Sequence, residues 1–144
     1  MEYLPNGYML DTSTGAFPLS TDSMLLADFA KLPRNAKVLD LGAGCGTLGV
    51  LLCAKDSGCC VTGVEISVSA HQAALENIRR NHLDSRLSSI CADLRSVDIE
   101  AGSYHCCISN PPIFPVVLPA DPTRWPGGKI IVLLRSCFPQ PQKR

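Results

Sequence analysis

The sequence predicts an α/β domain built on a mainly parallel sheet, because short apolar strand patterns alternate with helical patterns along the chain. The chain has 144 residues, of which 46% are hydrophobic and 18% charged, and this composition is typical of a globular protein. This length suits one domain. We expect a single domain over residues 1–144, with an N-terminal flap and helix (1–36), a central part that carries the functional motifs (37–112) and an atypical tail (113–144).

The N-terminal part is rich in turn residues and then becomes helical. Pro5-Asn6-Gly7 and Gly15 indicate turns, and residues 21–31 have a helical pattern that Ser20 or Thr21 can cap. We expect this flap and helix to lie over the sheet.

From residue 37 onwards, short strand patterns alternate with helix patterns. A glycine-rich turn, Gly42-Ala-Gly-Cys-Gly46, separates the first strand from the first helix of this part. Parallel sheets of this kind bind ligands beyond the carboxyl ends of their strands. The predicted strands are 37–41, 60–66, 87–91 and 104–109, and the predicted helices are 47–54 and a helix that begins at Ser67 or Ser69 and runs to about Asn81.

The tail departs from this alternation. Residues 113–128 contain four prolines and no helical pattern, although a parallel crossover takes at least about a dozen residues and is usually helical. Residues 127–134 predict a further strand, and residues 135–144 have no periodicity. A fifth parallel strand is therefore reached too early for an ordinary doubly wound domain.

The charge balance limits the classes of function. Lys and Arg total 13, as do Asp and Glu, which argues against a stand-alone basic nucleic-acid binder. Residues 111–144 carry five basic residues and one acidic residue, a net charge of +4, which suits either a polyanionic substrate or a solubilising tail. Apolar runs such as 130–134 are too short to cross a bilayer, and residues 1–10 lack a secretory signal. We expect a cytoplasmic protein that does not associate with a membrane.

Cysteine and histidine spacing predicts no metal site. None of the eight cysteines forms a C-x-x-C pair, and most lie in apolar strand-like segments such as Cys59-Cys60 and Cys106-Cys107. We expect reduced, mostly buried cysteines that act as small hydrophobic residues. The three histidines have no metal-ligand spacing and are expected to be structural.

The glycine-rich turn predicts a nucleotide-type ligand. Gly44, Gly46 and Gly49 match G-x-G-x-x-G after a strand, and Glu65 lies 21 residues after Gly44, at the end of the second strand. A carboxylate in that place can bind both hydroxyls of a ribose. The glycine pattern alone fits NAD, S-adenosylmethionine or a tight strand-to-helix turn without a ligand.

Two further carboxylates favour S-adenosylmethionine over NAD. Asp40 lies inside the first strand, where it can face the cationic amino group of the methionine moiety and would repel a pyrophosphate. Asp93 follows the third strand, where it can accept a hydrogen bond from an adenine amino group or simply cap the next turn.

A second motif, Ser109-Asn110-Pro111-Pro112, follows the fourth strand. The prolines fix the backbone and remove two donors, so the Asn110 side chain and the proline carbonyls can present acceptors. Two acceptors that hold an exocyclic amine aim its lone pair at a methyl group. The alternative interpretation is an ordinary Asn-Pro turn.

Four segments occur in an order that is typical of one family: Val-Leu-Asp-Leu-Gly-Ala-Gly-Cys-Gly (38–46), Gly-Val-Glu-Ile (63–66), Ala-Asp-Leu (92–94) and Ser-Asn-Pro-Pro (109–112). They resemble the motifs of class I S-adenosylmethionine-dependent methyltransferases, and Asn-Pro-Pro is similar to that of N6-adenine and N5-glutamine methyltransferases. Leu-Ser-Thr-Asp-Ser-Met-Leu-Leu-Ala (19–27) resembles the segment before the first motif in bacterial tRNA1(Val) adenine-N6 methyltransferases and their methyltransferase small domain relatives.

The resemblance covers about residues 5–124 and implies a Rossmann-like class I methyltransferase sheet with flanking helices and S-adenosylmethionine as cofactor. It implies a catalytic role for Asn110 and Pro111, which would bind the substrate together with Pro112 and Ile113. The residues implied to bind the cofactor are Thr21, Asp22, Asp40, Gly42, Gly44, Glu65, Ile66, Asp93, Leu94 and Asn110.

Two departures from the family pattern lead to expectations. Ile113 stands where the family usually has an aromatic residue, and stacking on a base contributes about 1–3 kcal/mol, so we expect weaker catalysis. The family continues for roughly another hundred residues after Asn-Pro-Pro. We therefore expect a truncated or frame-shifted product whose sheet is incomplete at its C-terminal edge, and the open edge favours a homodimer.

The function expected from these features is methyl transfer to an exocyclic amino group, first of all adenine N6 in tRNA or another structured RNA, with the base flipped out of its stack. One alternative is methylation of a glutamine side-chain amide in a protein, and another is a non-catalytic, truncated remnant that still binds the cofactor. A nicotinamide-dependent enzyme would leave Asn110-Pro111-Pro112 unexplained.

Overall fold

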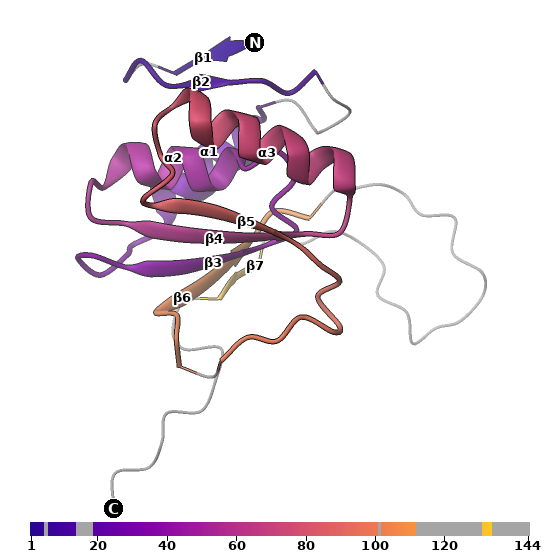
Figure 1. Cartoon of the computed structure of the whole chain (residues 1–144). Helices are drawn as coiled ribbons and strands as arrows, with labels where there is room; N and C mark the ends of the chain where they lie inside the picture. Colours follow the sequence, from indigo (N-terminus) through magenta and orange to yellow (C-terminus); the bar gives the residue numbers. More distant parts are fainter. Residues whose placement is uncertain (5, 14–18, 101, 112–130, 134–144) are drawn as a thin grey trace, which may run out of the picture.

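The computed structural model describes residues 1–4, 6–13, 19–100, 102–111 and 131–133. Its central feature is a five-stranded sheet (Figure 1). The strands are β3 (Lys37–Leu41), β4 (Cys60–Glu65), β5 (Leu87–Cys91), β6 (Cys106–Ser109) and β7 (Ile131–Leu133).

The strand order is β5-β4-β3-β6-β7, and all neighbours are parallel except β6 and β7. This confirms the predicted α/β class with a mainly parallel sheet. The last strand differs from the prediction in its direction, because β7 is antiparallel to β6. An antiparallel neighbour needs no helical crossover, which removes the conflict raised by the proline-rich segment. Strands β5 and β7 are the two edges of this sheet, and dimerisation through an edge stays a prediction.

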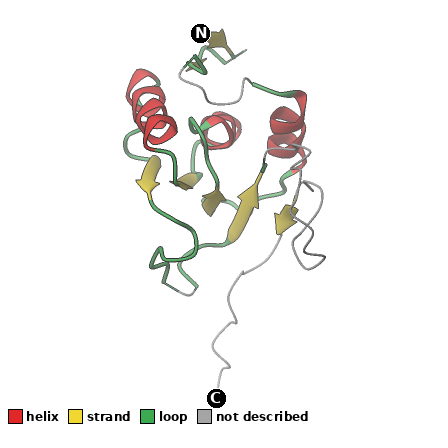
Figure 2. Cartoon of the chain, turned by 90° about the vertical axis from the view of Figure 1, so that its right-hand side faces the viewer, coloured by secondary structure: helices red, strands yellow, loops and turns green. Residues whose placement is uncertain are grey.

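Three helices, α1 (Thr21–Phe29), α2 (Thr47–Lys55) and α3 (Val68–Arg80), lie on one face of the sheet (Figures 1 and 2). The side chains of Ser20 and Ser67 cap α1 and α3 by accepting from backbone N–H groups of the first turn. Helix α1 ends two residues before the predicted end, because the backbone of Ala30 is extended (ψ 108°). None of the helices in the described residues is long and apolar enough to cross a membrane.

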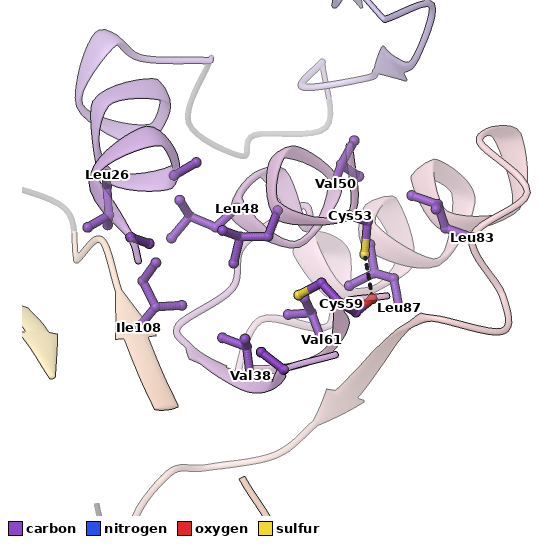
Figure 3. Packing of buried hydrophobic residues seen from close by; sticks show 14 of the residues in the cluster. Leu26, Val38, Leu48, Val50, Cys53, Cys59, Val61, Leu83, Leu87 and Ile108 are labelled. Carbon is purple, nitrogen blue, oxygen red and sulfur yellow. Dashed lines mark hydrogen bonds between the residues drawn. The ribbon is translucent and has the colours of Figure 1, made fainter. Parts of the chain in front are cut away.

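The two faces of the sheet are covered unequally. The face under the helices holds the larger core, which includes Val38, Val61 and Leu87 from the strands and Leu48 and Val50 from α2 (Figure 3). The opposite face holds a smaller cluster of Leu39, Val64 and Cys107. That cluster packs against residues of the connection between β5 and β6, namely Ala92, Val97, Ile99 and Tyr104.

Strand β3 contributes alternate residues to the two faces, as a strand must. Val38 belongs to the core on the helix side, whereas Leu39 belongs to the cluster on the opposite side. Asp40 is two residues after Val38 and therefore lies on the helix side, where it is 1% exposed. The period of the strand thus places one carboxylate in the interior of the domain.

The N-terminal flap is a small antiparallel hairpin of β1 (Glu2–Tyr3) and β2 (Met9–Leu10), which the sequence analysis expected as turns without strands. Figure 1 shows it beside α3, and two side-chain amides, one in that helix and one at its C-terminal cap, hold it there. Asn81 accepts from the Met9 N–H (2.7 Å) and donates to the Met9 carbonyl (2.7 Å). Asn77 accepts from the Asp11 N–H (2.8 Å) and donates to the Asp11 carbonyl (3.1 Å). These amides replace the strand partner that this side of the hairpin lacks.

Asn77 also donates to the Cys45 carbonyl (3.0 Å) and is completely buried. We predict that Asn77→Ala lowers the free energy of unfolding by about 2–4 kcal/mol, because it leaves the buried Cys45 carbonyl and partly buried backbone groups of Asp11 without this partner. Chemical denaturation measures the change. Asn6→Ala is the matched control, since Asn6 makes one exposed hydrogen bond, and it should change stability by less than about 0.5 kcal/mol. Equal effects of both variants would contradict the assignment.

Candidate functional site

Three polar residues lie at the carboxyl ends of three adjacent parallel strands. Asp40 is on β3, Glu65 ends β4, and Asn110 directly follows β6. Strand β3 lies between the other two, and the chain leaves it towards β4 on one side before β6 returns on the other. Ligands of open α/β sheets bind at this point, where the strand order reverses.

The glycine-rich turn follows β3 and is fixed to the end of β4. The N–H groups of Gly42 and Ala43 both donate to the Val64 carbonyl (2.9 and 3.1 Å). Gly42 and Gly44 have φ angles of +73° and +57°, which favour glycine. A Cβ atom on either would meet no other atom within 4 Å, so open space lies beside the turn. A ligand can therefore reach its backbone.

Close packing beneath the turn depends on a glycine in β4. A Cβ atom on Gly63 would lie 2.6 Å from the Cβ of Ala43, so a larger residue there would displace the turn. Below the turn lies a small, mostly apolar cavity between the sheet and helices α2 and α3, whose lining includes Asp40, Gly63 and Ala74.

Glu65 holds the glycine-rich turn and the start of α3 at the same time. Its Oε2 accepts from the Gly44 N–H (2.9 Å), and its Oε1 accepts from the Ser67 N–H (2.8 Å). A carboxylate oxygen has two lone-pair sites, so each oxygen can accept one more hydrogen bond. The predicted contact of Glu65 with ribose hydroxyls is compatible with this geometry and stays a prediction.

Asp40 is the most unusual group of the site. Its Oδ1 is buried and has no hydrogen-bond partner among the described residues. Burial, and then repulsion from Glu65, raises the pKa of Asp40 to about 7. A buried carboxylate without a partner is costly, and a cationic ligand group at this position would offset that cost.

Asn110 is held between β6 and α1. Its Nδ2 donates to the Oγ of Ser23 (2.9 Å), and the neighbouring Ser109 Oγ donates to the Leu41 carbonyl at the end of β3 (2.7 Å). Pro111 follows and is partly buried. Pro112 and Ile113 lie outside the described residues. Ser23 is a contact that the sequence analysis missed, because it carried no signal beyond its position in the first turn of α1.

Asp93, expected at the adenine end of the cofactor, is engaged by Arg95. Its Oδ1 accepts from the backbone N–H (2.9 Å) and Nε (3.0 Å) of Arg95, and its Oδ2 accepts from Nη2 (2.5 Å). These hydrogen bonds lower the pKa of Asp93 to about 2. Asp93 thus caps the turn after β5, which is the alternative interpretation of this residue. Its contact with a cofactor stays a prediction.

The sequence profile of the family described as methyltransferase small domain matches residues 14–116. The chain belongs to this family. The match includes the glycine-rich turn, Glu65, Asp93 and the Asn-Pro-Pro motif, and it confirms the resemblance on which the sequence analysis depends.

Two tRNA methyltransferases are similar to about 70% of the chain. A tRNA1(Val) (adenine(37)-N6)-methyltransferase of Bacteroides fragilis is 35% identical over 101 residues, which is 69% of this chain and 42% of the relative. One of Shewanella halifaxensis is 33% identical over 109 residues, which is 74% of this chain and 44% of the relative. The chain therefore spans less than half the length of these methyltransferases.

Solved structures confirm the fold. A SAM-dependent methyltransferase from Thiobacillus denitrificans in complex with S-adenosyl-L-homocysteine has a TM-score of 0.56 and 19% identity, over 65% of this chain and 38% of that chain. Such low identity supports the architecture alone, which is the Rossmann-like α/β fold of class I methyltransferases, as predicted.

Within this methyltransferase fold, the other predicted cofactor residues lie at the surface. Thr21 and Asp22 are exposed at the start of α1. Ile66 and Leu94, which follow β4 and β5, are 64% and 47% exposed. Exposed apolar side chains beside the ends of two strands are available to pack against a planar ring, and these four roles stay predictions.

The histidines make local contacts. His105 Nδ1 accepts from the Lys37 N–H (2.9 Å), and His71 Nδ1 lies 2.8 Å from the Oγ of Ser89. Five of the seven described cysteines are buried. Across the described part of the chain, no group of three or more His, Cys, Asp or Glu residues is arranged to hold a metal ion.

We predict that Asp40→Asn stabilises the protein at pH 8 by about 1–3 kcal/mol and has no such effect at pH 4. The folded pKa of Asp40 is about 7 and its ordinary value is 3.8. Protonated Asp40 is therefore favoured in the fold, and stability falls as the pH rises from about 4 to about 7, until the carboxylate is charged in both states. Urea unfolding across this range measures the difference.

Asp28→Asn is the control for this prediction, because the Asp28 side chain is 90% exposed on α1. It should change stability little at either pH. An Asp40→Asn effect that is the same at pH 4 and pH 8 would contradict the raised pKa.

Proposed function

We propose that this chain binds S-adenosylmethionine and transfers its methyl group to the exocyclic amino group of adenine in tRNA. The observation that carries the proposal is the buried Oδ1 of Asp40, which has no hydrogen-bond partner among the described residues, beside an open glycine-rich turn and at the same strand ends as Asn110. The names of the relatives, tRNA1(Val) (adenine(37)-N6)-methyltransferases, support the choice of acceptor.

The described residues fit this cofactor. Its ammonium group would pair with Asp40, whose Oδ1 has no described partner. The open side of Gly42 and Gly44 would take the middle of the molecule, and Glu65 would accept from the ribose hydroxyls. The exposed side chains of Ile66 and Leu94 would pack against the adenine ring, beside Asp93, and Thr21 and Asp22 would close over the site.

S-adenosylmethionine supplies a methyl group on a sulfonium; when an amine nitrogen takes the methyl, the C–S bond electrons stay on sulfur, leaving S-adenosylhomocysteine and an ammonium that loses one proton. The task of Asn110 and Pro111 is to position the amine. Their carbonyl oxygens would accept its two N–H groups, which turns the nitrogen lone pair towards the methyl carbon. The released proton passes to water, so no strong base is needed in advance.

An adenine in folded RNA reaches Asn110 after it leaves its stack. The net charge of +4 in residues 111–144 suits a polyanion such as tRNA. A tRNA substrate also supports a cytoplasmic location for the chain.

The decisive experiment supplies labelled S-adenosylmethionine and separate pools of bulk tRNA and protein. We expect label in tRNA, and a loss of about 100-fold in Asn110→Ala, because that variant removes an acceptor that positions the amine. Asn6→Ala, an exposed change in the hairpin, is the control. S-adenosylhomocysteine at about one hundred times its dissociation constant should stabilise wild type and both variants by about 2.7 kcal/mol in thermal unfolding.

Each other outcome points to a different function. Label in protein and none in tRNA would favour a glutamine acceptor. Stabilisation by S-adenosylhomocysteine without transfer to any acceptor would make the chain a cofactor-binding protein without activity. An unchanged transition would contradict the cofactor itself.

The Asp93–Arg95 pair makes a separate prediction for cofactor affinity. If Asp93 binds the adenine amino group, Arg95→Ala should tighten binding of S-adenosylhomocysteine by about two- to tenfold, since it frees a carboxylate that Arg95 now occupies. Arg79→Ala removes the same charge from an exposed position on α3 and is the matched control. Isothermal titration measures both, and equal changes would mean that Asp93 does not contact the cofactor.

A further inference from the structure

A buried serine of α1 contacts the predicted catalytic asparagine across 87 residues of sequence. Ser23 is 7% exposed, and its Oγ accepts from the Nδ2 of Asn110 (2.9 Å). This bond joins the first turn of α1 to the segment that follows β6. No described residue donates a hydrogen bond to the other end of the amide, Asn110 Oδ1.

Ser23 is itself fixed by the residue that caps its helix. Ser20 Oγ accepts from the Ser23 N–H (3.1 Å), and the two hydroxyl oxygens lie 3.1 Å apart. When the Ser23 hydroxyl donates to Ser20, its oxygen presents lone pairs alone to Asn110. Asn110 can then hydrogen-bond to Ser23 through its NH₂ group alone, because its carbonyl would face an oxygen that has no hydrogen left to donate.

The orientation of this amide decides what it can bind. The two ends of an asparagine amide have nearly the same shape, so a hydrogen-bond partner has to determine which end faces a ligand. With Nδ2 on Ser23, the acceptor Oδ1 is available for the N–H of a substrate amine. The reversed amide would present two donors to an amine that also donates, and this arrangement repels.

We propose that Ser23 is a positioning residue that sets the orientation of the Asn110 amide, and that the Ser20–Ser23–Asn110 chain of hydrogen bonds makes Asn110 an acceptor for the exocyclic amine. This rests on the proposed function. Ser23 acts through Asn110 and touches neither the cofactor nor the amine.

The experiment compares wild type with Ser23→Ala, Ser23→Thr and Ser20→Ala. Ser23→Ala should lower the methyl-transfer rate at saturating tRNA by about 10- to 100-fold, with little change in the dissociation constant of S-adenosylhomocysteine. Ser23→Thr keeps the hydroxyl and should recover most of the rate. Ser20→Ala frees the Ser23 hydroxyl hydrogen and should give an intermediate rate. Ser13→Ala, an exposed serine whose hydroxyl donates to Asp11, is the control and should match wild type.

A second readout is independent of turnover. In a chain with ¹⁵N-labelled asparagine, the NH₂ signals of Asn110, assigned by their loss in Asn110→Ala, should be shifted from free-amide values in wild type and Ser23→Thr. They should return to those values in Ser23→Ala, while the backbone amide signals remain those of a folded chain. An Asn110 signal that Ser23→Ala does not move would overturn the proposal.

The two proposals can fail separately. If wild type methylates tRNA and Ser23→Ala keeps its rate within twofold, the positioning role is wrong and the proposed function stands. If wild type transfers no methyl group, the proposed function fails, and the Asn110 signals alone decide whether Ser23 orients the amide.

Discussion

A carboxylate in the interior of a domain must be protonated or paired, and Asp40 is buried here with one oxygen that has no hydrogen-bond partner among the described residues. The neighbouring residues do not relieve this cost. Gly63, the neighbour of Asp40 on β4, has no side chain that could donate a hydrogen bond to it. Glu65 binds the glycine-rich turn, and its negative charge repels the Asp40 carboxylate. The fold therefore keeps a carboxyl group whose charged form is unfavourable at the end of its central strand, and a cationic ligand group at this position would stabilise that charged form.

The N-terminal segment connects both halves of the candidate site. Asn77 of α3 binds the backbone of Asp11 and the Cys45 carbonyl of the glycine-rich turn. Further along the chain, Ser23 binds Asn110 of the Asn-Pro-Pro motif. The N-terminal residues thus contact both the helix that holds the glycine-rich turn and the segment that carries Asn110.

Local patterns explain what could be predicted. The alternation of β3, α2, β4 and α3 follows from short apolar segments and from the Ser67 cap of α3, and the glycine-rich turn and Asn-Pro-Pro could be identified because their spacing is short. The hairpin could not be predicted, since its stability depends on Asn77 and Asn81 of a distant helix. The hydrogen bond between Ser23 and Asn110 could not be predicted either, because it joins residues that are far apart in the sequence. The direction of β7 depends on its partner β6, which a single strand pattern does not specify.

The two ends of the proposed cofactor site lie beside parts of the domain that are packed to different extents. Asp40 and the glycine-rich turn lie on the side packed by α2 and α3, whereas Asp93 and Leu94 begin the connection that covers the opposite face of the sheet. In the described residues that face is covered by Val97, Ile99 and their neighbours without a helix, although parallel sheets usually need both faces buried. Segments with few apolar contacts open at lower free energy than packed helices do. A ligand that spans from Asp40 to Asp93 would therefore connect the well-packed helix side of the sheet to the less packed connection between β5 and β6. Its binding would order the protein residues around the adenine more than those around the methionine moiety.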